Sequence, residues 1–555
     1  MQSGAPKKSV AVFGAGIAGL SAAHALNRLG YSVTVYEAKA EAGGFFRSSR
    51  SGSDRMPTEY SWHGFGPWYH NVFDLMKQIP YDETASLYHK ALSRPIDFGI
   101  FPDKRTACFY DKGLRSVPRM FGMTGPLEVA GWAWVMLKTW ASRRRTLEYY
   151  SKLKAADQWR KVLRGQAYRT WRSCFGPWIG SDWTRVSLHT AGQFFRHQLV
   201  NRPTHHHEAD GEGPAWSHGA GDGWLLLRGP SSEMWFEKWV NYLSENGVTF
   251  AWEEPLESLN FDGTRITGAC LGSGREVDAD RYILAIDPFT TADIVAKNRQ
   301  LAQERELRLF KPLTQDGRHV QVSFRLAFSE PILFPRERTA VVVADSEFNL
   351  TLFAQEQVWL PDVELGSGIQ SLWTGTSCAA TVPGRLYQKP VLYCTKEEFV
   401  EEVKAQIYGC GSLDQLVRQA NQGRSLRSFQ LAKIEVWHEW KFHPDGLKGE
   451  DPKWVNSTTT QAFQPNQRTT VPNLLLAGAH TRTSADVWSI EAAVESGRRA
   501  ARAVDGRVRV LVQFKPRWLR VLSMLDDLCY ALRLPHILDL LILGLLLYGI
   551  WSTLS

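Results

Sequence analysis

The stretch SVAVFGAGIAGLSAAHALNRLGYSVTVYE, residues 9–37, decides the fold of this chain. It starts with a continuous apolar run of the kind that forms a buried parallel strand. A glycine-rich turn follows, and residues 20–29 then predict a helix that Gly30 ends. The segment 31–37 predicts a second strand. A strand, a helix and a strand in this order form one βαβ unit, so the sequence predicts an α/β fold with a parallel sheet.

The turn after the first strand carries three glycines at the spacing GxGxxG. Gly14 allows the tight turn, Gly16 lets the backbone approach a pyrophosphate, and Gly19 lets the helix pack closely on the strand. The unpaired N–H groups around Ile17 and Ala18 would face that pyrophosphate, because a helix N-terminus favours negative charge. The turn therefore predicts a Rossmann-like dinucleotide-binding domain.

The second predicted strand ends in Glu37, eighteen residues after Gly19. A carboxylate at this place accepts hydrogen bonds from the adenosine ribose hydroxyls, and the adjacent Ala38 belongs to the same predicted site. The carboxylate also repels a 2′-phosphate, which makes NADP a poor ligand. A chance glycine-rich turn is disfavoured, because the strand, the helix and the carboxylate all occur where a dinucleotide site needs them.

The segment GGFFRS, residues 43–48, separates FAD from NAD as the expected ligand. It resembles the fingerprint of the FAD-dependent amine oxidase and phytoene desaturase superfamily, in which two glycines are followed by arginines. The resemblance implies that Gly43 and Gly44 pass close to the diphosphate and the flavin, and that Arg47 contacts the diphosphate. Phe45 stands where the family usually has its first arginine, so only Arg47 matches.

Two later segments extend this resemblance. Residues 247–285 are similar to the strands with which the family returns to its dinucleotide domain, and the resemblance places Leu256 against adenine. Residues 476–497 are similar to the family's C-terminal flavin motif. There the resemblance places Gly478 at the cofactor, and the backbone at Ile490 would direct a helix N-terminus at the flavin pyrimidine ring. The three blocks together imply bound FAD.

The order of these blocks predicts a discontinuous domain organisation. The FAD-binding domain is predicted to consist of residues 1–90, 231–290 and 466–506. An α+β substrate domain is predicted for residues 91–230 and 291–465, and a hydrophobic helical tail for residues 507–555. Residues 127–145 and 149–172 are expected to be helices of the substrate domain, and strand-like segments such as 320–328 occur in its second part.

Two aromatic segments supply candidates for the substrate pocket, although no catalytic group is identified. Residues 60–69 resemble a turn that approaches the flavin in carotenoid desaturases, so His63 is a candidate hydrogen-bonding group. A satisfied histidine in an aromatic core turn is an equally good interpretation. Trp440 falls where amine oxidases place an aromatic wall, although ordinary core packing is the commoner role of a tryptophan.

Composition and spacing exclude several other functions. The net charge of +8 is modest over 555 residues and no basic run is suited to a nucleic-acid arm, so we expect no nucleic-acid partner. The loop at 205–223 contains the triplet 205–207 and further acidic and histidine residues, but adjacent histidines in a loop point in different directions, and we expect no metal. The seven cysteines form no CxxC pair, which favours a reducing compartment.

The C-terminal segment predicts attachment to a membrane surface. Residues 540–551 form an uninterrupted apolar run, shorter than the ~20 residues that a spanning helix needs. Four basic residues lie upstream and would face anionic headgroups: Lys515, Arg517, Arg520 and Arg533. We expect the catalytic domain on the cytosolic side, because the basic flank precedes the run and no signal sequence precedes the FAD fold. A buried helix or a dimer contact is the alternative.

These features together predict a FAD-dependent oxidoreductase that acts on a lipophilic substrate. Desaturation or isomerisation of an isoprenoid or polyene is the first choice, with oxygen or a quinone as electron acceptor. Oxidation of a lipophilic amine or reduced nitrogen heterocycle is the second, because one fold supports both reactions. A non-catalytic FAD-binding membrane scaffold is the third, because Phe45 and Ala479 depart from the family pattern. The sequence is compatible with an oligomer.

Overall fold

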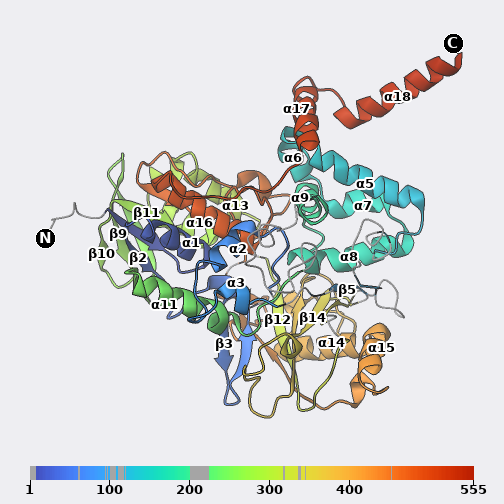
Figure 1. Cartoon of the computed structure of the whole chain (residues 1–555), viewed down its shortest axis with the longest axis horizontal. Coiled ribbons are helices and arrows are strands. Elements are labelled where there is room, and N and C mark those ends of the chain that lie inside the picture. Colours follow the sequence, from blue (N-terminus) through green and yellow to red (C-terminus); the bar gives the residue numbers. More distant parts are fainter. Residues whose placement is uncertain are drawn as a thin grey trace.

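The structure, a computed structural model, consists of a dinucleotide-type region, a helical region, a second sheet and a projecting C-terminal helix (Figure 1). The residues that it describes are 8–60, 63–93, 96, 98–100, 108–109, 118, 121–200, 224–316, 319–335, 339–343, 346–451 and 453–554. The predicted histidine-rich loop at 205–223 lies outside the described residues.

Five short strands form one parallel sheet at the centre of the dinucleotide-type region. They are β1 (Ser9–Phe13), β2 (Ser32–Tyr36), β7 (Thr249–Ala251), β11 (Arg281–Leu284) and β19 (Leu474–Leu476). Their order across the sheet is β19, β11, β1, β2 and β7, and every neighbouring pair is parallel. Because these strands come from three separated stretches of chain, the α/β class and the discontinuous dinucleotide-binding domain are confirmed.

The two helices of the predicted cofactor motifs pack against each other. Helix α1 (Ile17–Asn27) begins directly after the glycine turn and lies along α16 (Ile490–Val504), as Figure 1 shows. The approach is close because Gly497 of α16 faces α1: a Cβ atom there would lie 2.2 Å from the carbonyl oxygen of Ala18. Helix α11 (Glu237–Glu245) joins the same apolar core. This packing fixes both helix N-termini at one edge of the sheet.

The dinucleotide-type region extends further along the chain than predicted. Its antiparallel sheet contains β8 (Leu256–Phe261), β9 (Ile266–Leu271) and β10 (Glu276–Val277). Helices α12 (Pro288–Ala296) and α13 (Phe310–Thr314) follow. Ile294, Leu301 and Phe310 share one apolar core with β8, β9 and β11. The predicted boundary at residue 290 is therefore wrong, because the chain keeps packing on this core until about residue 314.

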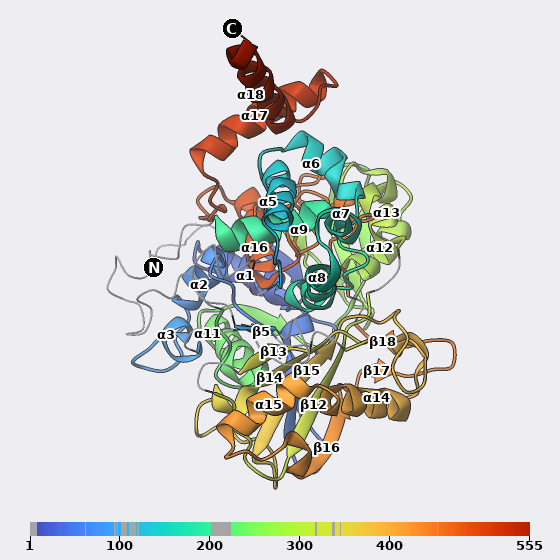
Figure 2. The same cartoon turned by 90° about the vertical axis from the view of Figure 1, so that its right-hand side faces the viewer.

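A seven-stranded sheet combines strands of both inserted segments. Its order is β16, β12, β15, β14, β13, β5 and β6. Among the described strands of this sheet, β13 and β5 are parallel neighbours and all other neighbouring pairs are antiparallel. The strands are β5 (Phe98–Ile100), β6 (Cys108–Phe109), β12 (Val322–Phe328), β13 (Ala340–Val342), β14 (Leu350–Ala354), β15 (Ser371–Ser377) and β16 (Leu431–Val436). Figure 2 shows α14 (Lys396–Tyr408) and α15 (Gly411–Ala420) beside this sheet.

The first inserted segment forms a layer of short helices. These are α5 (Pro126–Trp140), α6 (Arg144–Glu148), α7 (Ala155–Val162), α8 (Gly165–Ile179) and α9 (Leu188–Leu199). The predicted long helices at 127–145 and 149–172 are thus each interrupted. Gly165 has a φ of +48°, which breaks the helical path between α7 and α8. Trp132, Trp159 and Trp171 form the aromatic core of the layer.

Six smaller elements connect these regions. They are β3 (Ser48–Ser51), β4 (Met56–Glu59), α2 (His70–Met76), α3 (Leu87–Lys90), β17 (Trp440–Lys441) and β18 (Lys448–Gly449). Strands β3 and β4 form a hairpin, as do β17 and β18. In Figure 2 the seven-stranded sheet lies below the helical layer.

The predicted tail at 507–555 is not one separate unit. Its helices are α17 (Arg517–Ala531) and α18 (Ile537–Leu554). The Arg145 guanidinium pairs with Asp526 at 3.1 Å, and the Lys138 ammonium pairs with Asp539 at 2.6 Å. Only α18 projects away from the protein beyond these contacts (Figure 1). Within the predicted tail, α17 is therefore docked on the helical layer.

Candidate active site

A cavity of about 440 Å³ lies at the carboxyl edge of the parallel sheet, where the dinucleotide-type region meets the two inserted segments. Open α/β sheets bind their ligands at this edge. Twelve of the predicted site residues line the cavity: Gly14, Gly16, Ile17, Ala18, Glu37, Ala38, Gly43, Gly44, His63, Leu256, Gly478 and Ile490. Three do not line it: Gly19, Arg47 and Trp440. The cavity therefore brings the three predicted cofactor blocks together.

The glycine turn leaves space for a diphosphate. Gly14 has a φ of +103°, and a Cβ atom there would lie 2.6 Å from the Ala285 carbonyl oxygen. A Cβ atom on Gly19 would lie 1.9 Å from the carbonyl oxygen of Gly14, so Gly19 serves close packing. At Gly16 no atom lies within 4 Å of the Cβ position among the described residues. This gap at the N-terminus of α1 has the shape and the polarity that a dinucleotide diphosphate requires.

Glu37 is held in place for a ribose. Its Oε2 accepts a hydrogen bond of 2.6 Å from the Ala15 N–H, and its Oε1 accepts one of 3.0 Å from the Lys39 N–H. Burial raises the pKa of Glu37, and these two backbone bonds oppose the shift. A carboxylate offers about four acceptor sites, so capacity remains on the side that faces the cavity. The geometry fits the predicted contact with ribose hydroxyls.

Arg47 does not have the predicted diphosphate contact. Its side chain is 2% exposed and pairs with the carboxylates of Glu439 and Asp451, the second at 2.6 Å. The guanidinium also lies 5.7 Å from the centre of the Trp437 ring. The charge is therefore neutralised inside the protein wall, and Phe45 stands at the cavity in its place. The sequence did not indicate these pairs, because both carboxylates lie about four hundred residues away from Arg47.

The N-terminus of α16 forms the opposite end of the cavity. Ser489 caps this helix by accepting a hydrogen bond of 3.1 Å from the Ala492 N–H, and both Ser489 and Ile490 line the cavity. The helix dipole directs partial positive charge at this end. Trp488 lies edge-on to Phe45 with 6.2 Å between the ring centres. A flat aromatic ring system with negative charge at one edge fits between these groups.

His63 lines the cavity as a neutral histidine. Burial lowers its pKa well below the ordinary value, and its ring centre lies 3.7 Å from that of Phe46. Its Nδ1 is buried and has no hydrogen-bond partner among the described residues. This arrangement favours the ligand-contact interpretation over the satisfied core histidine, because a buried polar atom without a partner is costly.

Trp440 supports the cavity from behind. It is 6% exposed, and its ring centre lies 5.5 Å from that of Tyr60, which does line the cavity. The predicted aromatic wall is thus formed by Tyr60, and Trp440 packs in the second sheet's core. Sequence position alone could not distinguish the two rings, because both are buried aromatic residues in the same cluster.

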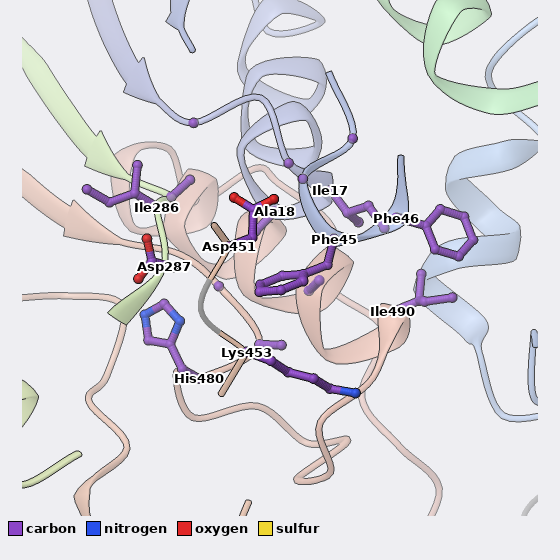
Figure 3. A pocket seen from close by; sticks show the side chains of 18 of the residues that line it. Ile17, Ala18, Phe45, Phe46, Ile286, Asp287, Asp451, Lys453, His480 and Ile490 are labelled. Carbon is purple, nitrogen blue, oxygen red and sulfur yellow. The ribbon is translucent and has the colours of Figure 1, made fainter. Parts of the chain in front are cut away.

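The lining residues that were not predicted from the sequence include two with a titratable side chain, Lys453 and His480 (Figure 3). The Lys453 ammonium donates to the Gly180 carbonyl oxygen at 2.7 Å and to Oε1 of Gln321. Burial lowers the pKa of Lys453 to about 8 and that of His480 to about 3. Lys453 belongs to no predicted motif, and within the segment 476–497 the resemblance places Gly478 and Ile490 at the cofactor but assigns nothing to His480. The residue next to Gly478 in the motif, Ala479, carries no charge, so no acidic group competes there.

No group of three or more metal-ligating side chains occurs among the residues that the structure describes. The residues that line the cavity instead fit a dinucleotide with an aromatic ring system: a diphosphate gap, a carboxylate for ribose and a helix N-terminus at the far end. The cavity therefore offers backbone N–H groups and apolar side chains, which suit an organic ligand.

Two family models match the chain in the regions that carry this site. Residues 12–79 match the NAD(P)-binding Rossmann-like domain, and residues 438–505 match the flavin-containing amine oxidoreductase family. The first match contains the glycine turn and Glu37, and the second contains Lys453 and the α16 N-terminus. No curated protein matches the chain in sequence.

Several solved structures share the fold. Cyclohexylamine oxidase from Brevibacterium oxydans IH-35A is 16% identical, with a TM-score of 0.57 over 90% of this chain and 99% of that one. Putrescine oxidase bound to putrescine is 12% identical, with a TM-score of 0.60 over 90% and 100%. An oxidoreductase from Methanosarcina mazei is 13% identical, with a TM-score of 0.55 over 90% and 100%. The chain thus shares the fold of these oxidoreductases, and its residues 438–505 are similar to the flavin-containing amine oxidoreductase family.

Proposed function

We propose that this enzyme acts on a lipophilic substrate that it takes from a membrane, and that the reaction is desaturation or isomerisation of an isoprenoid or polyene. The observation that carries the proposal is the wall of the cavity beyond the cofactor motifs. It consists largely of apolar and aromatic side chains, among them Tyr60, Trp68, Tyr69, Ile179, Phe194 and Trp224. Such a wall binds an apolar chain or ring and excludes water.

FAD, when bound, supplies two-electron oxidation: it accepts a hydride from a substrate carbon and passes the electrons on, here to oxygen or a quinone. Desaturation removes a hydride and a proton from neighbouring carbons and leaves a double bond. His63 is neutral, so one of its ring nitrogens is an unprotonated acceptor, and Nδ1 is the one without a partner among the described residues. We assign to His63 a hydrogen bond at its Nδ1 with the bound ligand, because the burial that keeps the ring neutral also makes it a weak base.

The C-terminal helices support the membrane source of the substrate. Helix α18 spans 18 residues with a mean hydropathy of 2.0, and 6% of these residues are buried. On α17 an apolar stripe faces solvent at helical spacing: Trp518, Val521, Leu525, Leu528 and Leu532. An interfacial helix followed by an apolar helix is the arrangement of a membrane-attached enzyme. We place the catalytic domain on the cytosolic side, because the basic residues precede the apolar helix.

Lipid analysis tests the proposed reaction. Cells that express the full chain are compared with cells that express Gly16→Leu, and apolar extracts are analysed by mass spectrometry. We expect products with two hydrogens fewer, or isomers of equal mass, only with the wild-type protein. Products that have lost ammonia would assign the amine oxidase reaction instead. No difference between the extracts, with flavin reduced only by dithionite, would assign the scaffold function.

The electron acceptor is tested with the protein purified in detergent. Turnover is expected with oxygen or a soluble quinone and without added nicotinamide, because the one glycine fingerprint in the sequence serves FAD. Strict dependence on NADPH for each turnover would contradict the proposal and indicate a monooxygenase or reductase.

A further inference from the structure

Lys453 places a buried ammonium group in the wall of the cavity, on the side of the substrate domain. The residue is 6% exposed, and its two acceptors are the Gly180 carbonyl oxygen and Oε1 of Gln321. Gly180 ends α8, Gln321 leads into β12, and Cys378 directly follows β15 and accepts from the Gln321 amide at 3.2 Å. These three neighbours belong to the inserted segments and none to the parallel sheet.

The charge of Lys453 has no counterion within the described part of the chain. Both of its acceptors are neutral oxygens, and none of the ion pairs among the described residues includes it. An ammonium group has three donors, so one donor remains. A buried charge is normally paired, because its removal from water is costly. Within the described part of the chain, the positive charge of Lys453 is therefore not balanced by a nearby negative charge.

Among the described residues, five acidic side chains line the cavity and none of them pairs with Lys453: Glu37, Glu254, Asp287, Glu450 and Asp451. Glu254 lies 3.6 Å from the Arg275 guanidinium, and Glu450 lies 3.6 Å from the Lys441 ammonium. Glu37 accepts from two backbone N–H groups at the ribose site, and Asp287 caps α12 by accepting from two others. Asp451 forms its ion pair with Arg47 at 2.6 Å. Figure 3 shows the side chains of Asp287 and Asp451 at some remove from the end of the extended Lys453 side chain. The missing anion must therefore come from a ligand.

We propose that the substrate carries a carboxylate, which Lys453 binds, and that its apolar body lies along the aromatic wall. This inference rests on the proposed function and narrows its substrate class to lipophilic acids. Two features of the site support it: an ammonium with a spare donor, and apolar surroundings that strengthen a charge-assisted hydrogen bond. The same ammonium repels a protonated amine, so the site discriminates against cationic substrates of the same shape.

The interaction is expected to depend on pH. Burial lowers the pKa of Lys453 to about 8, so the ammonium form predominates below pH 8 and is lost above it. The titratable groups that face Lys453 are Cys378, His63 and His319. Burial raises the pKa of Cys378 to about 11 and lowers those of both histidines well below the ordinary value, so none of them titrates near pH 8. Carboxylate binding should thus weaken as the pH rises through about 8.

The test uses the full-length holoprotein in detergent and three probes of equal shape: 4-phenylbutyrate, 4-phenylbutanol and 4-phenylbutylamine. Binding is followed by the perturbation of the flavin absorption band. We expect the wild-type protein to bind 4-phenylbutyrate at least ten-fold more tightly than the alcohol and the amine at pH 7. A ten-fold difference in affinity corresponds to the weak end of the range for a hydrogen bond to a charged group. The preference should disappear at pH 9.5.

Two variants and one control assign the effect to Lys453. Lys453→Met should bind the acid and the alcohol equally, whereas Lys453→Arg should keep a preference for the acid. Lys311→Met, at an exposed lysine on α13, should behave as the wild-type protein. Flavin content is measured for each variant. A yellow wild-type protein that binds the amine best, or that binds the acid no better than the alcohol at pH 7, overturns the proposal. A protein without flavin would instead overturn the proposed function.

If Lys453→Met does not fold, the wild-type pH profile still decides the question. Affinity for 4-phenylbutyrate should fall about ten-fold or more between pH 7 and pH 9.5 while affinity for 4-phenylbutanol stays constant. An acid affinity that is independent of pH in this range would contradict a role for Lys453.

Discussion

The Gln513 amide donates a hydrogen bond of 3.2 Å to Oε1 of Glu491 and so joins the segment before α17 to the first turn of α16. Glu491 also accepts from the N–H groups of Asn71 and Val72 at 3.0 and 3.1 Å. The residue after Ile490 is therefore held by α2 and by the chain that leads to α17. The N-terminus of α16, which faces the cavity, depends on that chain for its position.

Two truncations should have different effects, because one removes only the projecting part of the C-terminal segment and the other also removes the docked part. A chain ending at residue 540 removes most of α18 and should stay folded, keep its flavin and no longer need detergent. A chain ending at residue 505 also removes Gln513 and the Leu511 backbone that bonds Asn71, so it should lose flavin or unfold. Visible spectra and size-exclusion chromatography without detergent check both chains.

The wild-type protein provides the control for this truncation. It should sediment with membranes, resist extraction by high salt and be released by detergent, because the apolar helix contributes more than the basic flank. A shortened chain ending at residue 540 that still sediments with membranes would show that α17 alone suffices for attachment.

The protonation of Glu491 should make stability depend on pH. Burial raises the pKa of Glu491 from 4.5 to about 8 in the folded state. A raised carboxyl pKa contributes stability that is fully present below pH 4.5 and is lost as the pH rises to about 8. Glu491→Gln should remove this dependence, which amounts to at most about 1.4 kcal/mol per pH unit. Denaturant unfolding of both proteins at pH 5, 6.5 and 8 measures the difference.

A difference between wild type and Glu491→Gln that does not change between pH 5 and pH 8 would contradict this assignment. The comparison of the two proteins matters because other buried groups titrate as well. Burial lowers the pKa of His480 to about 3, for example, and this contributes the opposite slope between pH 3 and 6.5 in both proteins.

Substitutions in the glycine turn should separate cofactor binding from folding. Gly16→Leu should give a folded protein without FAD, because nothing described lies within 4 Å of the Cβ position and the side chain would fill the diphosphate gap. Gly19→Leu should not fold, because its Cβ atom would lie 1.9 Å from the carbonyl oxygen of Gly14. Circular dichroism and flavin content check the pair. A Gly16→Leu protein with a full complement of FAD would contradict the site.

Arg47 should prove to be a structural residue. Arg47→Met leaves the carboxylates of Glu439 and Asp451 without their buried partner, and loss of one partner of a buried pair costs about 3–5 kcal/mol. Denaturant unfolding should show this loss, and the double variant Arg47→Met with Glu439→Gln should recover part of it. If the single variant has normal stability and binds FAD more weakly, Arg47 contacts the diphosphate after all.

Glu37→Gln should weaken FAD binding without unfolding the protein. The amide keeps one acceptor oxygen for the backbone but loses a charged acceptor toward the ribose, and we expect a loss of about 1–3 kcal/mol in binding free energy. Equilibrium dialysis of the apoprotein with FAD measures the change. Unchanged affinity would remove Glu37 from the binding site.

The sequence predicted the parts of the fold and the site that depend on neighbouring residues. Gly14, Gly16 and Glu37 lie within one βαβ unit, so their geometry follows from local spacing and the structure places all of them at the cavity. The parallel sheet could also be assembled, because each strand begins or ends at a motif with a known place in the fold.

Contacts between distant segments could not be predicted. Arg47 and its partner Glu439 are 392 residues apart, and Lys453 and Gln321 are 132 apart. No spacing rule connects such pairs. The apolar pattern of α17 is also ambiguous, because a stripe that packs on the helical layer and a stripe that meets a membrane have the same period. The ion pair of Arg145 with Asp526 and the burial of Leu519 against Ala141 show that the helix is docked.

The visible spectrum of the purified full-length protein under anaerobic conditions tests the central claim most directly. We expect the bands of FAD at one per chain, and we expect them to bleach when a lipophilic polyene acid is added without nicotinamide and to return with oxygen or a quinone. A protein that carries no flavin after reconstitution with FAD, or whose bands change only with dithionite or NADPH, would contradict the account.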